Sequence, residues 1–425
     1  MGNTNLLNVR GLIAMRIWII DHYAVPERYN PLIRQTIFAR KLMERGYQVR
    51  IFSASTVHNS DINLIDGTDL YREEFADGVN YTYVNCHGYK GNGLKRIINM
   101  EEFAYKLPKV CNEYVKIEGK PEVILACSMT LQACKKGIQI ARQYNAKPIA
   151  QISDLWPESI VAYGKASKYN PLIWILRNIE RWIYTHADKI IFTMEGAYDY
   201  ILERKWDKEI PYEKITIINN GVDINQFNYN REHYLIKDED LENDSIFKVV
   251  YTGSIRAVNN LGLLLDVAKE IKDKDIRFLI WGDGDELSKL KKRVYEEEIE
   301  NVIFKGKVEK KYIPYITSHA DLNMAHNNPS ELFRFGISFN KIFDYLAAGK
   351  PVMTDFPCCY NPVVKCKAGV AVDNSNVNEI ANAICQVKKM DCAMYLSLCN
   401  GARKGAEMYS FDYLTEKLCD TIREM

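Results

Sequence analysis

Short apolar segments alternate with longer amphipathic segments along most of the chain. Apolar runs that predict buried strands stand at 16–21, 48–55, 122–128, 147–154, 189–194 and 214–221. Between them, hydrophobic residues recur at helical spacing and predict helices over 33–45, about 130–144 and 171–186. This alternation is typical of parallel sheets covered by helices, so residues 1–225 are expected to form one doubly wound, Rossmann-like domain.

A second alternating series follows, and it predicts a second Rossmann-like domain over 248–410. Its strand patterns stand at 247–255, 277–284, 301–308, 321–327 and 350–356. The charged, weakly patterned residues 229–245 separate the two series, so we expect a solvated linker over 226–247. A helix pattern over about 411–424 ends the chain. The length of 425 residues supports two domains, because a single hydrophobic core rarely grows that large.

Charge and hydropathy remove several function classes. The net charge is +1, with 29 Lys and Arg against 25 Asp and Glu in residues 1–225 and 27 against 30 in the remainder. This mild tilt lacks the strongly basic face of a nucleic-acid binder, so no nucleic-acid partner is expected. No apolar run approaches the roughly 20 residues of a membrane span.

The first residues and the cysteines bear on the compartment. Residues 1–14 lack the long apolar region of a secretory signal, and we expect them to be a leader without fold content before Met15. A myristoylation signal is disfavoured because residue six is Leu. The eleven Cys form no CxxC pair and no zinc spacing, so they are expected to be reduced and mainly structural, as in a cytoplasmic protein.

Loops after the strands of the second series carry residues suited to an anionic ligand. In open α/β sheets, ligands bind beyond the carboxyl ends of the strands. Gly253, with Ser254 beside it, lets backbone approach a ligand, and Arg256 is a permanent cation suited to a diphosphate. The alternative is a glycine turn with a surface Arg. After the next strand, Gly282 permits a tight turn, and the acids around it are more typical of a helix cap than of a metal site.

The segment 331–355 carries the strongest of these patterns. Ser338 or Asn340 is expected to cap a helix that begins here. Lys341 stands in the first turn, where a cation opposes the helix dipole unless an anion is bound. Asp344 lies one turn further along the same face, within reach of a ribose hydroxyl. The alternative is an ordinary amphipathic helix with an extended Lys side chain.

In the first half, the strand at 147–154 is followed by a loop that places Trp156 beside the carboxylates of Asp154 and Glu158. This group is suited to stacking on a sugar or holding an acceptor, although Trp156 packed over the sheet edge is the alternative. His22 follows the first strand and is expected at the same edge, where a structural role is the competing interpretation.

These segments together resemble family 4 of the glycosyltransferases, in particular the fucosaminyltransferase-like branch of capsule, O-antigen and exopolysaccharide synthesis. The matching stretches are DLWPES (154–159), HADKIIFTMEGAYDYI (186–201), INNGVDINQF (218–227), YTGSI (251–255) and S-x-N-K-x-F-D-Y-x-A-A-G-K-P (338–351). The resemblance implies the α/β fold called GT-B, with two tandem Rossmann-like, doubly wound domains facing each other across a cleft. It also implies that residues 411–425 form a helix crossing back to the first domain.

The resemblance assigns roles to the candidate residues. The second domain would hold a nucleotide-diphosphate sugar through Gly253, Ser254, Gly282, Lys307, Val308, Arg334, Gly336, Ser338, Asn340 and Asp344. The catalytic residues would be Arg256, Lys341 and Asp154, and the acceptor-binding residues His22, Trp156 and Glu158. Many members carry two Glu at a fixed spacing, matched here by Gly336 and Asp344, which leaves the first sugar contact to Glu331, Arg334 or the backbone of 333–338.

The implied reaction is a retaining transfer, of hexosyltransferase type, with no metal or other cofactor. A UDP-sugar is favoured, such as an N-acetylated hexosamine or a 6-deoxyhexosamine, and the acceptor would be a polyprenyl-diphosphate-linked glycan at the inner face of the plasma membrane. The basic and apolar stretch 88–109 would rest on that surface or pack as a helix on the first domain. A sugar-nucleotide epimerase and a non-catalytic nucleotide-sugar-binding protein stay open as alternatives.

Overall fold

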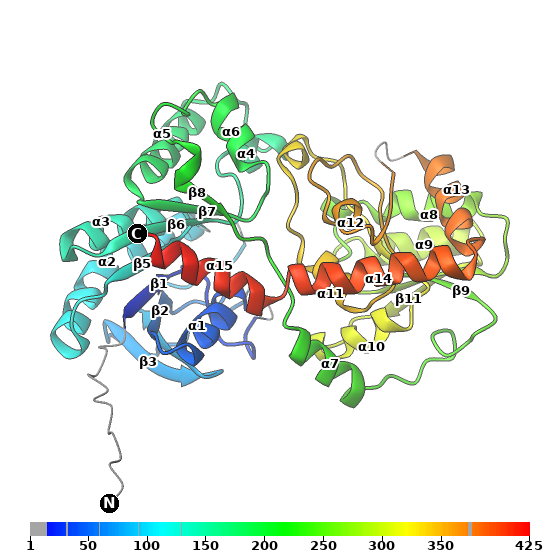
Figure 1. Ribbon diagram of the computed structural model, residues 1–425, viewed down its shortest axis with the longest axis horizontal. Helices are drawn as coiled ribbons and strands as arrows, with labels where there is room; N and C mark the ends of the chain where they lie inside the picture. Colours follow the sequence, from blue (N-terminus) through cyan, green and yellow to red (C-terminus); the bar gives the residue numbers. More distant parts are fainter. Residues whose placement is uncertain (1–14, 31–32, 59, 92, 129, 373–375) are drawn as a thin grey trace, which may run out of the picture. The chain divides into compact units, whose positions relative to one another are not determined.

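The computed structural model describes residues 15–30, 33–58, 60–91, 93–128, 130–372 and 376–425 (Figure 1). Contacts divide the chain into two compact units. The first contains residues up to 152, 176–190 and 421–425, and the second contains 153–175 and 191–420. These bounds differ from the expected domains 1–225 and 248–410. The backbone N–H of Gly196 donates to the carbonyl of Phe335, and Asn220 donates to Ser338, so both segments belong to the second unit.

An eight-stranded sheet forms from the first series of strands, in the order β3-β4-β2-β1-β5-β6-β7-β8. The strands are β1 (Arg16–Ile20), β2 (Gln48–Ala54), β3 (Tyr71–Ala76), β4 (Val79–Val84), β5 (Val123–Cys127), β6 (Lys147–Ile152), β7 (Lys189–Phe192) and β8 (Ile215–Ile217). In the spatial order of the sheet, the neighbouring pairs β4–β2, β2–β1, β1–β5 and β5–β6 are all parallel, as expected. The antiparallel hairpin of β3 and β4 was not anticipated; its turn residues Asp77 and Gly78 both have positive φ, which suits a tight hairpin turn.

The first-sheet helices are α1 (Arg34–Glu44), α2 (Leu94–Glu118), α3 (Leu131–Tyr144) and α5 (Pro171–His186). Helices α2 and α3 pack on one another, and their apolar faces bury Trp18, Phe52, Phe103 and Tyr114 in one core. The predicted helices over 33–45, 130–144 and 171–186 are therefore confirmed to within a residue or two at their ends.

The second sheet has six strands in the order β11-β10-β9-β12-β13-β14, and all its pairs are parallel. The strands are β9 (Phe247–Thr252), β10 (Ile276–Trp281), β11 (Val302–Gly306), β12 (Leu322–Ala325), β13 (Val352–Thr354) and β14 (Gly369–Ala371). From β9 the chain first moves outward through β10 and β11, then returns to β12 on the other side of β9. The strand order therefore reverses between β9 and β12, which is the place where doubly wound sheets bind ligands.

The remaining helices belong wholly or mostly to the second unit. They are α4 (Glu158–Ala162), α6 (Ala197–Glu203), α7 (Ile224–His233), α8 (Leu261–Glu270), α9 (Leu287–Glu296), α10 (Ile313–Ser318), α11 (Asn340–Ala347), α12 (Pro362–Lys365), α13 (Val377–Lys388), α14 (Cys392–Met408) and α15 (Phe411–Arg423). Four 3-10 turns lie at Tyr212–Lys214, Ala257–Asn259, Lys310–Tyr312 and Glu331–Phe335.

The segment 226–247, for which we expected a solvated linker, contains a helix and a buried residue. Helix α7 covers its beginning, with Asp223 capping the backbone N–H of Gln226. Further on, Leu241 is buried beside β9 and β10, and Lys305 of β11 pairs with the carboxylates of Asp238 and Asp240. Charge alone suggested solvent here, but those acids have a lysine partner that sequence spacing does not reveal.

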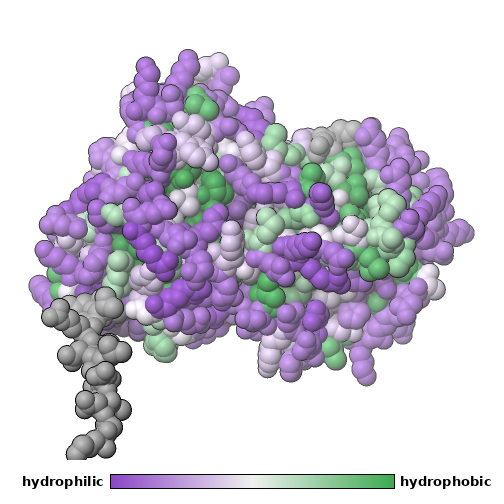
Figure 2. Space-filling view, viewed as in Figure 1, coloured by the Kyte–Doolittle hydropathy of each residue, from purple (hydrophilic) through white to green (hydrophobic). Residues whose placement is uncertain are grey.

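Most apolar residues are buried in these cores. Figure 2 shows that the viewed surface is largely hydrophilic, with apolar residues gathered in separate patches. Within the described residues, no helix is both long and apolar enough to cross a bilayer. All eleven cysteines are free of disulfides, and Cys86, Cys111, Cys127 and Cys134 are among the buried ones.

Glycine packing between the loops after β9 and β10 gives a stability prediction. A Cβ on Gly284 would lie 2.1 Å from the carbonyl oxygen of Ile255, closer than any real contact. Gly284→Ala should therefore lower the free energy of unfolding by about 1–3 kcal/mol, as overpacking does. Gly262→Ala is the matched control: the atom nearest to its added Cβ is a flexible Arg293 nitrogen at 3.5 Å, and alanine favours its helix by up to about 1 kcal/mol. Urea denaturation of both variants checks this, and equal stabilities would contradict it.

Candidate functional site

The strand-order reversal of the second sheet brings together the loops after β9 and β12. Gly253, Ser254 and Arg256 follow β9, and His326 follows β12 directly. Ser254 and Arg256 are exposed, whereas His326 is fully buried. The turn at Gly253–Arg256 is therefore accessible to a ligand, whereas the His326 side chain is not.

Lys341 reaches this turn from α11. Its Nζ donates to the Tyr251 hydroxyl at 3.2 Å and lies 4.5 Å from the centre of the Tyr251 ring. The Tyr251 hydroxyl in turn donates to the carbonyl of Ser254 at 3.0 Å. A Cβ placed on Gly253 would stand only 3.4 Å from Lys341 Nζ. The structure thus brings Gly253, Ser254 and Lys341 together, as the sequence predicted.

The amino end of α11 is open. The residue before the helix is Phe339, whose side chain makes no capping hydrogen bond to the first turn. The expectation that Ser338 or Asn340 caps this helix is wrong: the Ser338 hydroxyl accepts from the backbone N–H of Asn220 at 2.7 Å, and Asn340 is the exposed first residue of α11. Backbone N–H groups therefore remain available beside Lys341, and such a helix end favours an anion.

Burial sets the protonation of the charged groups on α11. Loss of hydration lowers the pKa of half-buried Lys341 to about 8, against the opposing attraction of the Asp355 carboxylate. Burial raises the pKa of Asp344, and Lys310 counteracts this effect. An anion beside Lys341 would favour its charged form, so the site is electrostatically prepared for a phosphate-like ligand.

Gly282 has a packing role. A Cβ there would lie 1.9 Å from the carbonyl oxygen of Gly253, so only glycine allows the loop after β10 to touch the loop after β9. The N–H of Gly253 donates to the carbonyl of Trp281 at 3.0 Å, and that of Ile255 to the carbonyl of Asp283 at 2.9 Å. Gly282 thus supports the Gly253 turn, and its direct contact with a ligand stays a prediction.

A buried His–Asp pair lies under the turn, and sequence reasoning missed it. His326 Nδ1 bonds to the Asp355 carboxylate, which follows β13, and Nε2 donates to the carbonyl of Asn260 at 2.9 Å. Both side chains are inaccessible to solvent. Asn260 has a left-handed φ of 48° and begins α8, so the pair fixes the exit of the loop that carries Arg256. The sequence does carry a signal for this pair, because His326 and Asp355 each directly follow a buried strand, β12 and β13.

Gly336 occupies the position where the resembled family has its first Glu. Its φ is 94°, and a Cβ would lie 3.3 Å from the backbone N of Glu195. Arg334 is exposed and forms a two-oxygen ion pair with Glu203 at 2.8 and 3.0 Å. Arg334 is thus engaged by a carboxylate, and Glu331 is exposed at the start of the adjacent 3-10 turn.

Lys307 and Val308 follow β11, the edge strand two positions from the reversal. Lys307 is exposed, and Val308 is partly buried against the core of Leu241, Val250 and Trp281. Their role around a base stays a prediction.

In the first unit, His22 is fully buried. Asn99 Nδ2 donates to the Thr56 hydroxyl and to the carbonyl of His87, so Asn99 Oδ1 accepts from His22 Nε2 at 2.8 Å. Burial lowers the pKa of His22 to about 3, which keeps the ring neutral. The structure does not support direct contact between an acceptor and the His22 ring, because the ring has no solvent-exposed surface.

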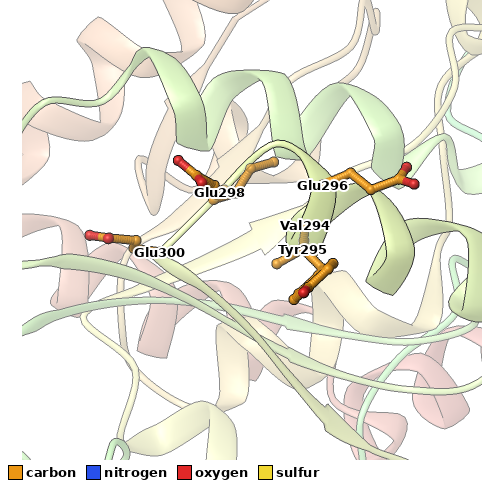
Figure 3. Close-up of a pocket in the computed structure, with 6 residues that line it drawn as sticks. Val294, Tyr295, Glu296, Glu298 and Glu300 are labelled. Atoms are coloured by element: carbon orange, nitrogen blue, oxygen red, sulfur yellow. The ribbon is translucent and has the colours of Figure 1, made fainter.

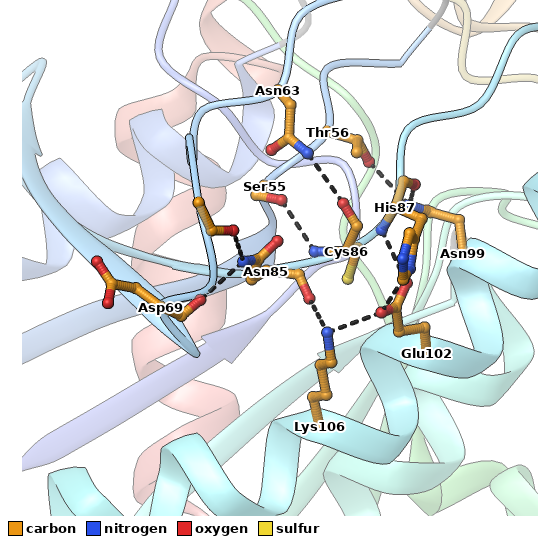
Figure 4. Close-up of polar contacts among 11 residues, drawn as sticks. Ser55, Thr56, Asn63, Asp69, Asn85, Cys86, His87, Asn99, Glu102 and Lys106 are labelled. Atoms are coloured by element: carbon orange, nitrogen blue, oxygen red, sulfur yellow. Dashed lines mark hydrogen bonds and ion pairs between the residues drawn. The ribbon is translucent and has the colours of Figure 1, made fainter.

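Figure 4 shows how this network joins the start of α2 to the ends of β2 and β4. Lys106 donates to the carbonyl of Asn85 at 2.8 Å and to Glu102 at 2.7 Å, and Glu102 also bonds to His87. These polar side chains of α2 therefore serve the packing of the first unit.

The three candidates at the end of β6 differ in their surroundings. Asp154 is exposed and Trp156 is half-buried. Glu158 is buried and forms an ion pair with Arg204. Glu158 is thus part of an internal ion pair, whereas Asp154 remains accessible to a ligand.

Two surface hollows are lined by residues other than those of the Gly253 turn, one at the end of α9 and one in the loops after β7 and β13. Figure 3 shows the one at the end of α9, where Glu298 and Glu300 point to one side and Glu296 to the other. Another, of about 460 Å³, is lined by Glu195, Cys358, Tyr360, Asn361, Val364 and Lys365. Among the described residues, no three His, Cys, Asp or Glu side chains are arranged to hold a metal ion.

Comparison with known proteins relates both halves of the chain to one enzyme class. Residues 36–226 match the family described as Glycosyltransferase Family 4, and residues 246–389 match the family described as Glycosyl transferases group 1. A search of curated proteins gives no match.

Several solved structures share the fold. Sucrose-phosphate synthase from Thermosynechococcus elongatus is 16% identical, with a TM-score of 0.68 over 96% of this chain and 98% of that one. HepE of Anabaena in complex with UDP is 13% identical, with a TM-score of 0.66 over 97% and 100%. The apo form of the lipopolysaccharide outer core galactosyltransferase WaaB is 13% identical, with a TM-score of 0.61 over 96% and 99%. These likenesses confirm the expected GT-B fold.

The pKa of Lys341 gives a pH prediction for the binding of a nucleoside diphosphate. Its ammonium is protonated below about pH 8 and neutral above it. Since the bound anion favours the charged form, the dissociation constant for UDP should rise as pH increases through about 8. Calorimetric titration between pH 6.5 and 9.5 measures this, with Lys341→Ala as the control that should bind more weakly and lose the step. A step that persists in Lys341→Ala would assign it to another group.

The buried His326–Asp355 pair gives a stability prediction. Asp355→Ala should lower the free energy of unfolding by about 3–5 kcal/mol, because it leaves His326 buried without its partner. Asp355→Asn keeps an acceptor oxygen and should cost less. Denaturant unfolding of both variants tests the order, and a smaller loss in Asp355→Ala than in Asp355→Asn would contradict the pairing.

Proposed function

Because the chain is a family 4-like glycosyltransferase with the GT-B fold, we propose that it transfers a sugar from a UDP-sugar to a lipid-linked saccharide. The donor assignment rests on one observation. Lys341, the open amino end of α11 and the Gly253 turn meet where the strand order reverses between β9 and β12. The related fold of HepE, solved with UDP and with UDP-glucose, supports uracil as the base of the donor.

Charge development explains what these residues contribute. As the bond from sugar to diphosphate breaks, negative charge grows on the leaving oxygen, and preorganised positive groups stabilise it. Lys341 and the N–H groups of α11 are held in place by protein, so they need little reorganisation. Arg256 is exposed and adds a permanent positive charge when it turns toward the diphosphate. Removing one such donor typically slows the reaction by roughly a hundred- to a thousandfold.

The proposed stereochemical outcome is retention. The acceptor hydroxyl would attack the face from which the nucleotide leaves, and the leaving phosphate would accept its proton, so the scheme uses no metal. Asp344, whose pKa is raised by burial, is proposed to bond a ribose hydroxyl. Asp154 is the accessible carboxylate proposed to orient the acceptor, with Trp156 beside it.

The proposed acceptor is a polyprenyl-diphosphate-linked glycan of bacterial surface polysaccharide synthesis, such as capsule or O-antigen. WaaB shares the fold and is named a lipopolysaccharide outer core galactosyltransferase, which supports this class of acceptor. Within the stretch 88–109, Leu94, Ile97, Ile98 and Tyr105 are exposed and remain candidates for contact with the cytoplasmic membrane face. Phe103 is buried and Lys106 is ion-paired, so these two residues drop out of that contact.

An assay of UDP-, GDP- and dTDP-sugars separates the candidate functions. Purified protein is incubated with each sugar nucleotide, with and without a detergent-solubilised lipid-diphosphate glycan, and nucleotide release is measured. Release should require the acceptor, be fastest with a UDP-sugar, and fall roughly a hundred- to a thousandfold in Lys341→Ala. Lys291→Ala on α9 is the control and should act as wild type, since its exposed side chain lies on another helix.

The alternatives predict different results in the same assay. An epimerase would convert the sugar nucleotide without an acceptor, and a binding protein would bind UDP without release. Anomeric configuration of the product, read by proton NMR coupling, tests retention separately. An inverted product would contradict the retaining scheme while leaving transferase activity in place.

A further inference from the structure

Exposed apolar and basic side chains gather on residues 163–177, which lead into and begin α5. The exposed apolar residues are Tyr163, Tyr169, Leu172, Trp174 and Ile175, with exposed fractions of 49, 83, 56, 67 and 49%. Single exposed apolar residues are ordinary, but so many large ones within thirteen positions are unusual for a protein surface that only contacts water.

Helix α5 divides its own side chains between two sides. Ile173, Glu180, Ile183 and Tyr184 are buried against the protein. At about 100° per residue, Trp174 and Ile175 fall on the opposite side of the helix, which faces outward, and Leu172 is exposed in the first turn. The first turns of α5 therefore present an apolar surface away from the core, the reverse of an ordinary surface helix.

The charge of this run has one sign. No Asp or Glu occurs between Glu158 and Glu180, while Lys165, Lys168 and Arg177 lie within it. Lys165 and Lys168 are exposed, and Lys168 lies over the Tyr169 ring. Aromatic and apolar side chains interleaved with lysines match the boundary between acyl chains and anionic head groups. Two copies of this face would bring like charges together, which disfavours self-association through it.

We propose that residues 163–177 form a docking surface for an anionic phospholipid membrane. Trp174, Leu172 and Ile175 enter the boundary region, while Lys165 and Lys168 bind the head groups. This inference rests on the proposed lipid-linked acceptor, since docking would hold the enzyme where that substrate is concentrated. It assigns the main lipid contact to α5 and the loop before it, in addition to the exposed positions of α2.

Vesicle binding of the whole chain tests the proposal. Co-sedimentation is measured with phosphatidylcholine vesicles and with vesicles containing about one third phosphatidylglycerol, in the absence of donor and acceptor. The double variant Lys165→Glu/Trp174→Ser should lose at least tenfold in partition onto the anionic vesicles, since it reverses one charge and removes one aromatic anchor. The matched control Lys291→Glu/Tyr295→Ser on α9 makes the same changes at exposed positions and should bind as wild type.

Each outcome decides the proposal. Wild-type binding to anionic vesicles that is lost in the α5 variant and kept in the α9 control supports it. Absence of wild-type binding, equal binding to both lipids, or undiminished binding of the α5 variant would overturn it. A wild-type dimer that the α5 variant converts to monomer would overturn it in favour of a contact between copies. The vesicle assay contains no sugar substrate, so it tests docking alone. If the protein docks but fails to transfer sugar to a lipid-linked acceptor in the release assay, only the proposed function is contradicted.

Discussion

An ammonium group that gives up part of its water needs an electron-rich partner, and in this chain Tyr251 is that partner for Lys341. The tyrosine ring and hydroxyl hold the lysine, and the same hydroxyl donates to the carbonyl of Ser254. One side chain at the end of β9 thereby fixes both the cation and the turn it faces. The open end of α11 and the Gly253 turn can act as one anion site because this contact sets their spacing.

Support for that junction comes from backbone packing and from buried polar groups. Gly282 and Gly284 let the loop after β10 lie directly against the loop after β9. His326 and Asp355 hold the start of α8 from below through the carbonyl of Asn260. Neither pair needs to touch a ligand, yet each limits how far the turn can move. A rigid support of this kind is what electrostatic stabilisation of a leaving diphosphate requires.

Several polar groups among and around the candidate acceptor residues are paired inside the protein. His22 is neutral and bonded to Asn99, and Glu158 is paired with Arg204. Of the candidate acceptor residues, Asp154 and Trp156 keep surface that a ligand can reach. Apolar surface is instead exposed at the start of α5, where Trp174 and Ile175 face away from the core and Leu172 is exposed beside them. A charged donor site and an exposed apolar surface suit the proposed transfer from a sugar nucleotide to a lipid-linked acceptor.

Local periodicity predicted the alternation of buried strands and amphipathic helices, because it reports which face of each element is buried, but it missed the β3–β4 hairpin. It also predicted that Gly253, Arg256 and Lys341 belong to one edge, since parallel strands end together. Which polar side chains were already paired became clear from the three-dimensional packing. Ser338 bonds Asn220 instead of capping α11, Arg334 pairs with Glu203, and helix α7 occupies part of the expected linker. Such pairings join residues distant in sequence, and their energy depends on burial and on partners, neither of which is encoded in local spacing.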